Sequence, residues 1–256
     1  MRMVAEPHLL RYKGPGGGSG RVRKSVDDGT MIDAVRPKRT RIQIRNEAAI
    51  LAAARTMFAD HGFNGATMEK IAEQADMSQS NIHHYFKTKA DLYLRVLEQT
   101  LGLWIEPLDG LDPCGDPAAE LMTYIDRKLE MARKDPEASR VFAHEMLDGA
   151  PYIAGHLQTQ VRDKAQRFAE IVEHWVAAGR MRPIDPYHLI FMIWATTQHY
   201  ADFAPQVKAV LGRSRLTKAE FDDARATISS ILIEGLFARL GGDGTGALRL
   251  DCPGRG

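Results

Sequence analysis

The sequence is poor in cysteine and has no long hydrophobic run. Its two cysteines, Cys114 and Cys252, lie in Pro- and Gly-flanked sequence without zinc-type spacing, so we expect neither a disulfide framework nor a metal knuckle. No apolar stretch approaches the roughly 20 residues that a membrane span requires. No hydrophobic segment followed by a small-residue cleavage site stands near the N-terminus. We therefore expect a cytoplasmic protein with no membrane segment and no metal site.

Glycine and proline are present in ordinary amounts. The 256 residues include 22 Gly and 12 Pro, which argues against collagen-like or low-complexity architecture. Hydrophobic residues make up 44% and charged residues 26% of the chain, which is too apolar for a disordered protein and too charged for a membrane bundle. The chain is therefore expected to fold around a buried core.

Positive charge is concentrated in one short segment. The net charge is only +1, yet five basic residues with no acidic residue among them occur close together: Arg36, Lys38, Arg39, Arg41 and Arg45. Such a cluster fits an arm that binds nucleic-acid phosphates. A solvated basic linker would have the same composition, so the cluster alone leaves both interpretations open.

Helical periodicity runs through the chain between two segments that lack it. Residues 1–36 predict a flexible extension rich in Gly, Pro and charge, and residues 241–256 predict a flexible tail. Between them, apolar residues recur at helical spacing, and no pattern typical of strands competes. The predicted helices span 40–61, 68–75, 79–85, 89–108, 118–134, 137–147, 153–178, 187–204 and 218–240. The sequence therefore predicts an all-α fold.

Several residues near the start of this region indicate a helix-turn-helix. Gly62 is a plausible end for the first helix, and Thr67 and Ser78 are good N-caps for the two short helices that follow. Ala72 has to be small where the short helices cross, and Ile82 is the apolar anchor of the second one. Two short helices joined by a turn of three or four residues have the helix-turn-helix geometry.

This segment resembles the N-terminal domain of the TetR family of transcriptional regulators, whose pattern is T-x-x-x-I-A-x-x-A-G-V-S…Y-x-x-F-x-x-K-x-x-L. Asp76 stands where the family usually has glycine, and Ser80 stands where glycine is common. Because Asp tolerates a left-handed turn conformation better than most residues, we expect no change of fold. The matching residues are Thr67, Ile71, Ala72, Ala75, Ser78, Phe86, Lys89 and Leu92.

The resemblance implies two helical domains. A three-helix DNA-binding domain with the helix-turn-helix would cover residues 37–87, and a helical ligand-binding and dimerisation domain would cover 88–240. The last two helices would pair with their copies in a second subunit. The resulting homodimer would place two helix-turn-helix motifs, one from each subunit, on a palindromic double-stranded operator. Repression is the family's common mode of regulation.

The second short helix would enter the major groove, where Asn and Gln amides can pair bidentately with adenine. The candidates for base edges or nearby phosphates are Gln79, Ser80, Asn81 and His83. The candidates for phosphate contacts, through side-chain donors and helix N-termini, are Thr67, Ser78, His84, Tyr85 and Lys89. Arg39 and Arg41 of the basic cluster would add affinity for the DNA backbone. The adjacent histidines diverge by about 100° on a helix, so they cannot readily share a metal ion.

Two stretches of the C-terminal half carry a narrower resemblance. EASRVFAHEMLDGAP and IDPYHLIFMIWATTQHYADFAPQV are similar to the C-terminal domain of TetR-family regulators of pyrimidine utilisation, which respond to uracil and thymine. The resemblance extends from about residue 40 to residue 238. It implies that Trp104 forms one wall of an effector pocket and that Gln198 recognises the polar edge of the ligand.

Side chains of the penultimate predicted helix fit a flat ligand. Phe191, Trp194, Gln198 and Asp202 follow one another at steps of three, four and four, so they lie on one stripe. The Trp194 ring can cover a heterocycle, and the Gln198 amide offers a donor beside an acceptor, which complements a pyrimidinedione. In the opposing interpretation, both tryptophans are core and Gln198 bonds to the backbone. The ligand-binding candidates are Trp104, Phe191, Trp194 and Gln198.

Other functions remain open at this point. A TetR-type regulator would have the same sequence features if its effector were a purine, an amide or a lipophilic drug, or if it bound DNA constitutively. An enzyme acting on pyrimidines is a further alternative. The sequence has no nucleophile elbow, no paired catalytic carboxylates beside a base, no phosphate loop and no metal spacing. We therefore expect a regulator without catalytic residues or cofactors.

Overall fold

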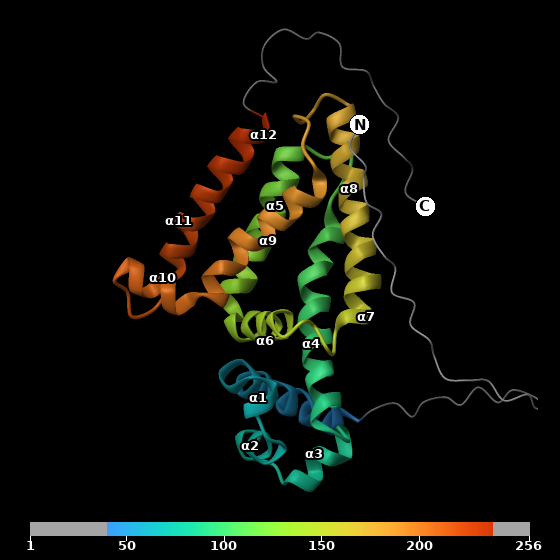
Figure 1. The fold of residues 1–256 in the computed structure, drawn as a ribbon, viewed down its shortest axis with the longest axis vertical. Helices are drawn as coiled ribbons and strands as arrows, with labels where there is room; N and C mark the ends of the chain where they lie inside the picture. The colour runs from blue at the N-terminus through green and yellow to red at the C-terminus, as the bar shows by residue number, and fades with distance from the viewer. Residues whose placement is uncertain (1–39, 238–256) are drawn as a thin grey trace, which may run out of the picture. The chain divides into compact units, whose positions relative to one another are not determined.

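The computed structural model describes residues 40–237 (Figure 1). All regular secondary structure in this range is helical, which confirms the predicted all-α fold. The predicted extension over 1–36, the predicted tail over 241–256 and Arg39 lie outside the described residues. Between residues 40 and 237, no helix is long and apolar enough to cross a membrane.

The first three helices are α1 (Arg41–Gly65), α2 (Met68–Gln74) and α3 (Gln79–Tyr85). Each begins at a hydroxyl cap: Thr40, Thr67 and Ser78 accept hydrogen bonds from backbone N–H groups three residues later. The N-caps predicted at Thr67 and Ser78 are thus confirmed. At Gly62, φ is 66°, so the helical path of α1 breaks where its end was predicted, although the helix is assigned as far as Gly65.

The turn between α2 and α3 has a left-handed backbone. Asp76 has a φ of 53°, and the backbone N–H of Met77 donates to the carbonyl of Ala72 at 3.0 Å. Asp is one of the few residues with a side chain that visits this conformation routinely. Asp76 thus adopts the left-handed conformation that it was expected to tolerate in place of glycine.

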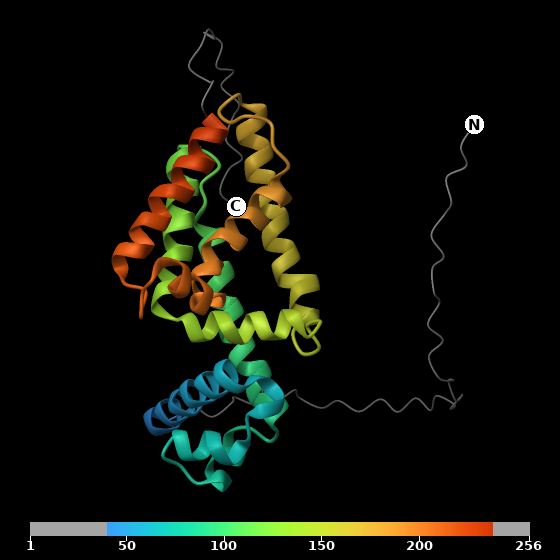
Figure 2. The ribbon, with the colours of Figure 1, turned by 60° about the vertical axis from the view of Figure 1, so that its left-hand side comes forward.

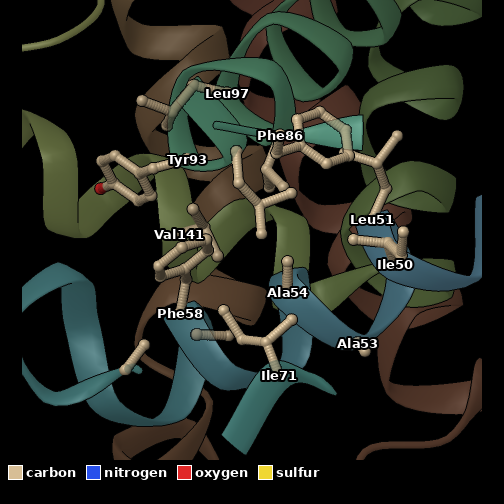
Figure 3. Close-up of a cluster of buried hydrophobic side chains, with 14 of the residues drawn as sticks. Ile50, Leu51, Ala53, Ala54, Phe58, Ile71, Phe86, Tyr93, Leu97 and Val141 are labelled. Atoms are coloured by element: carbon tan, nitrogen blue, oxygen red, sulfur yellow. The ribbon is translucent and has the colours of Figure 1, made fainter. Parts of the chain in front are cut away.

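One hydrophobic core joins these three helices to two later ones, α4 (Lys89–Ile105) and α6 (Pro136–Leu147). Ile82, the predicted anchor of α3, is 0% exposed. The Phe58 ring on α1 meets the Tyr93 ring on α4 edge-on at 4.8 Å, and Val141 on α6 belongs to the same cluster (Figure 3). The DNA-binding domain predicted over 37–87 therefore shares its core with α4 and α6, and a movement of either helix changes its support.

The remaining helical segments are η1 (a 3₁₀ turn, Glu106–Gly110), α5 (Pro117–Lys134), α7 (Ala154–His156), η2 (π-helical, Leu157–Val161), α8 (Arg162–Ala177), α9 (Pro186–Asp202), α10 (Ala204–Leu211), α11 (Lys218–Ser229), η3 (π-helical, Ser230–Glu234) and α12 (Gly235–Phe237). Helices α5 and α9 pack side by side, with α8 against α9 and α11 against α5 (Figures 1 and 2). A second core fills the space between them, and Tyr124, Phe168 and Trp175 are buried in it.

Several predicted helix boundaries need correction, and the helix predicted over 218–240 is one of them, because residues 218–237 are divided into α11, η3 and α12. The helix predicted over 89–108 ends at Ile105, because Pro107 lies in the 3₁₀ turn η1. The helix predicted over 153–178 is divided into α7, η2 and α8. The helix predicted over 187–204 ends at Asp202, since Pro205 has no N–H to donate to a preceding helical carbonyl. The chain then continues as α10, which was not predicted.

Substitution of Asp76 tests the left-handed turn. We expect Asp76→Val to lower the free energy of unfolding by about 1–2 kcal/mol, because a β-branched residue is strained at positive φ. We expect Asp76→Gly to change it by less than about 1 kcal/mol, because glycine adopts this conformation freely but loses more entropy on folding. Urea unfolding followed by circular dichroism measures both values. Equal stabilities for the two variants would contradict the turn geometry.

Candidate DNA-binding surface and effector site

The first turn of α3 presents the side chains predicted to read bases. Because Ile82 is completely buried, the orientation of α3 is fixed, and Gln79 and Ser80 are exposed while Asn81 is half-buried. The Ser78 hydroxyl accepts from the backbone N–H of Asn81 at 3.2 Å and lies 3.0 Å from the Ser80 hydroxyl. The cap therefore holds two amide side chains at the N-terminal end of one short helix, and their contacts with bases stay a prediction.

The last turn of α3 carries three ring side chains with different surroundings. The Tyr85 hydroxyl accepts a hydrogen bond from the Asn46 amide of α1 at 3.3 Å. The ring nitrogen Nδ1 of His83 lies 3.2 Å from the Lys87 carbonyl oxygen. His84 is exposed, and its ring meets the Tyr85 ring edge-on at 5.7 Å. His84 is therefore the most accessible of the three to a phosphate.

Three other candidates for DNA contacts lie at helix starts. Thr67 and Ser78 are exposed at the N-termini of α2 and α3, and Arg41 is exposed at the first residue of α1. Helix N-termini favour anions because their free N–H groups and dipole are positive. Within residues 40–237, no three His, Cys, Asp or Glu side chains gather in a metal-binding arrangement.

Lys89 is held within the protein. Its ammonium group donates to the backbone carbonyls of Phe63 at 2.7 Å and Ala66 at 2.9 Å, and it lies 4.4 Å from the centre of the Phe63 ring. These contacts join the start of α4 to the C-terminal end of α1. The geometry thus gives Lys89 contacts that hold α4 against α1, and its predicted phosphate contact stays a prediction.

Trp104, the candidate on α4, is 8% exposed. Its ring lies 5.8 Å from the Phe142 ring of α6, and the Lys128 ammonium of α5 lies 4.1 Å from the ring centre. Trp104 also lines a groove of about 1080 Å³ whose other walls come from α1, α4, α5 and the start of α6. The indole therefore stands between an open groove and a buried lysine.

The α9 candidates lie outside this groove. Trp194 donates from Nε1 to the Tyr124 hydroxyl of α5 at 2.7 Å. Gln198 is half-buried, whereas Phe191 is 51% exposed, with its ring 5.8 Å from the Trp194 ring. Of the four ligand candidates, Trp104 alone thus lines this groove. Their ligand contacts stay a prediction.

A polar cluster connects Trp104 to the α9 stripe. Lys128, one helical turn after Tyr124 on α5, is only 3% exposed. Burial lowers the pKa of Lys128 to about 7, against the opposing effect of the Asp202 carboxylate on α9. The buried Ser139 hydroxyl of α6 donates to that carboxylate. Burial raises the pKa of Asp202, while the Ser139 hydrogen bond and the Lys128 charge act in the opposite direction. Polar groups of α5, α6 and α9 therefore meet beside Trp104.

Sequence reasoning did not select Lys128 or Ser139. A signal for Lys128 was present, because it falls three residues after Ile125 and seven after Leu121, on the buried face of α5. A lysine on such a face is unusual unless it is paired. Ser139 had no comparable signal, because a serine at a single position of a helix does not indicate which face it occupies.

Substitution of Lys89 tests its positioning role. We expect Lys89→Met to lower the free energy of unfolding by about 1.5–3 kcal/mol, because it removes hydrogen bonds from a charged donor to two carbonyls. The exposed Lys87→Met is the control and should change stability by less than about 0.5 kcal/mol. Unchanged stability in Lys89→Met, together with a salt slope of DNA binding reduced by about one, would instead assign the ammonium to a DNA phosphate.

Comparisons with solved structures place the helical architecture among known regulators. AibR, crystallised in complex with isovaleryl coenzyme A and operator DNA, superposes with a TM-score of 0.59 at 18% identity, covering 73% of this chain and 97% of that chain. A bacterial regulatory protein in the tetR family from Rhodococcus RHA1 superposes with a TM-score of 0.63 at 19% identity, covering 75% and 97%. At such identities the likeness shows the fold alone.

Sequence comparison identifies the family. Residues 50–96 match the family model described as bacterial regulatory proteins, tetR family, and residues 97–239 match the one described as YcdC-like protein, C-terminal region. The chain is 43% identical over 202 residues to the HTH-type transcriptional regulator RutR of Escherichia coli K12. The aligned residues cover 79% of this chain and 95% of that protein. The chain therefore belongs to the TetR family, and it is a DNA-binding transcriptional regulator.

Proposed function

We propose that this regulator is a repressor whose affinity for its operator is lowered by a small planar pyrimidine, uracil or thymine. The observation that carries the proposal is the 43% identity to RutR over 95% of that protein, since the strings around α6 and α9 resemble pyrimidine-responsive regulators. The contact between Trp104 and Lys128, and the Asp202 carboxylate that acts on the Lys128 charge, support a polar, aromatic environment suited to a heterocycle.

Operator reading is assigned to α3, with Gln79 and Asn81 directed to base edges. Thr67, Ser78 and His84 would hold phosphates on either side, and the basic cluster from residue 36 to 45 would follow the DNA backbone. Two copies of α3 are needed to read a palindrome. The chain would therefore act as a homodimer.

The helices α9 and α11 are proposed as the dimer interface. Most of the large apolar side chains that are exposed in residues 40–237 lie between α9 and η3: Tyr187, Phe191, Met192, Phe203, Val210, Leu211 and Ile231. Exposed apolar side chains gathered in one region are typical of protein interfaces. Phe191 fits this face better than a ligand pocket, since it is 51% exposed.

Coupling between effector and DNA would run through α4 and α6. Trp104 lies on α4, whose start is joined to α1 through Lys89. Helix α6 is joined to α1 by two ion pairs, Arg55 with Asp135 at 2.5 Å and Arg140 with Asp60 at 3.1 Å. A ligand that shifts α4 or α6 would thus change the orientation of α1 and of the helix-turn-helix formed by α2 and α3. The ligand must bind the two orientations with different affinities, because equal affinity shifts nothing.

A tryptophan-fluorescence titration with uracil and thymine, run with and without operator DNA, tests the effector. We expect quenching together with release of DNA, and we expect Gln198→Ala to weaken uracil binding by about 10- to 100-fold through loss of paired amide hydrogen bonds. The control Gln206→Ala removes an exposed amide of α10 and should bind as wild type does. If Gln198→Ala binds uracil as tightly as wild type does in this titration, the Gln198 amide does not contact the ligand.

Binding to a library of operator variants tests the reading residues. We expect Asn81→Ala to lose about 1–3 kcal/mol of discrimination at particular base pairs while other positions keep theirs. Gln74→Ala, which changes an exposed amide on α2 instead, is the control. A uniform loss of affinity across all variants would place Asn81 on the DNA backbone and not on a base.

A TetR-type regulator with a non-pyrimidine effector is the alternative that one observation favours. The groove that Trp104 lines measures about 1080 Å³, a volume typical of sites for ligands much larger than a pyrimidine. If uracil and thymine neither quench the tryptophans nor release DNA, this groove becomes the place to search for a larger effector.

A further inference from the structure

We propose that Lys128 and Asp202 form a donor–acceptor pair that reads the edge of the effector, selecting flat heterocycles that carry a ring N–H beside a carbonyl. This inference rests on the proposed function, because it concerns the same effector. It adds the two groups that would distinguish a cyclic amide from other planar molecules of the same size.

Lys128 is a buried donor that lacks an acceptor. The residue is 3% exposed, no side chain or backbone group in residues 40–237 accepts a hydrogen bond from its ammonium, and the ammonium lies 4.1 Å from the centre of the Trp104 ring. A buried charged donor without an acceptor is costly. A carbonyl oxygen of a ligand beside Trp104 would satisfy it.

Asp202 is the matching acceptor. The Ser139 hydroxyl, which is 0% exposed, donates to Oδ1 of Asp202 and so fixes the carboxylate. The second oxygen, Oδ2, can still accept a ring N–H. Gln198 lies one turn earlier on α9, on the same stripe. Lys128 beside Trp104 thus supplies a donor and Asp202 an acceptor that acts on the same lysine, which is the pattern that complements adjacent C=O and N–H groups.

Binding would require an exchange at Trp104. In the structure the Lys128 ammonium covers a face of the indole. A heterocycle that stacks on this face displaces the ammonium, which then donates to the ligand carbonyl. The exchange replaces a cation–π contact by a charge-assisted hydrogen bond, the stronger of the two.

The experiment compares ligand binding by Lys128→Met with that of wild type, using isothermal titration with uracil, 2-pyridone, succinimide and hydantoin. We expect Lys128→Met to bind about 10- to 100-fold more weakly, because the ligand carbonyl loses a charged donor. Lys87→Met, at an exposed lysine outside α5 and outside the groove that Trp104 lines, is the control and should bind as wild type does. Circular dichroism melts check folding, which should be unchanged or improved, since a lone buried charge is removed.

A second variant separates recognition from a structural role. Asp202→Asn keeps the shape and the acceptor for Ser139 but presents N–H groups toward the ligand. We therefore expect it to favour cytosine, whose N3 carries no hydrogen, and to raise the ratio of cytosine to uracil affinity by about 10-fold or more. A loss of packing alone would weaken both ligands and leave their ratio unchanged.

The outcomes distinguish this inference from the proposed function. Tight uracil binding by wild type and by Lys128→Met alike would overturn the inference and leave the pyrimidine effector in place. Binding of another cyclic amide but not of uracil or thymine, with loss in Lys128→Met, would support the inference and overturn the pyrimidine effector. Binding of none of these compounds by wild type would overturn both.

Discussion

The contact between Tyr93 and Phe58 is the constraint on which the arrangement of this regulator depends. Tyr93 belongs to α4 and Phe58 to α1, and their rings meet at 4.8 Å in one continuous core. The Tyr93 ring also meets Tyr152 edge-on at 5.3 Å, while the backbone N–H of Tyr152 donates to the buried Glu145 carboxylate of α6. Because packed cores have few alternative arrangements, a shift of α4 reaches α1 as a reorientation and not as a gradual deformation.

Asp135 gives α6 a second connection to α1, the first helix of the DNA-binding domain. One carboxylate oxygen accepts from the backbone N–H of Ala138 at 3.1 Å and caps α6, and the other pairs with Arg55 of α1 at 2.5 Å. The residue also follows the last turn of α5 directly. One side chain thus joins the end of α5, the start of α6 and the middle of α1, so the start of α6 cannot rotate without changing its ion pair to α1.

Local interactions explain what could be predicted from the sequence. The Thr67 and Ser78 side chains accept hydrogen bonds from N–H groups only three residues later, and the left-handed conformation of Asp76 concerns a single residue. Such features depend on residues close together in the sequence, so they can be predicted from it. Lys89 contacts carbonyls 26 and 23 residues earlier, and no spacing records which of several possible partners a surface lysine takes. Its motif position therefore indicated the fold, and its contacts with these two carbonyls could not be derived from that position.

The effector region was predictable only in part, for the same reason. The stripe on α9 follows from helical periodicity, and the buried position of Lys128 on α5 was visible in the same way. Their meeting with Trp104 depends on how α4, α5, α6 and α9 cross, which periodicity does not determine. The end of α9 at Asp202 was also not predicted. Pro205 cannot donate a backbone hydrogen bond to continue α9, and it lies in the first turn of the next helix, α10.

The free energy of the switch limits where an effector can bind. Moving an equilibrium from 1:99 to 99:1 takes roughly 5.5 kcal/mol of differential affinity, whereas a heterocycle of about eight heavy atoms binds with at most about 12 kcal/mol. Roughly half of the binding energy must therefore come from contacts made in one state only. Stacking on an indole that remains accessible in both states would not contribute. A carbonyl contact with Lys128 would contribute to the switch only if one orientation of the DNA-binding helices allows the ammonium to leave Trp104, which is the condition that the proposed cluster has to meet.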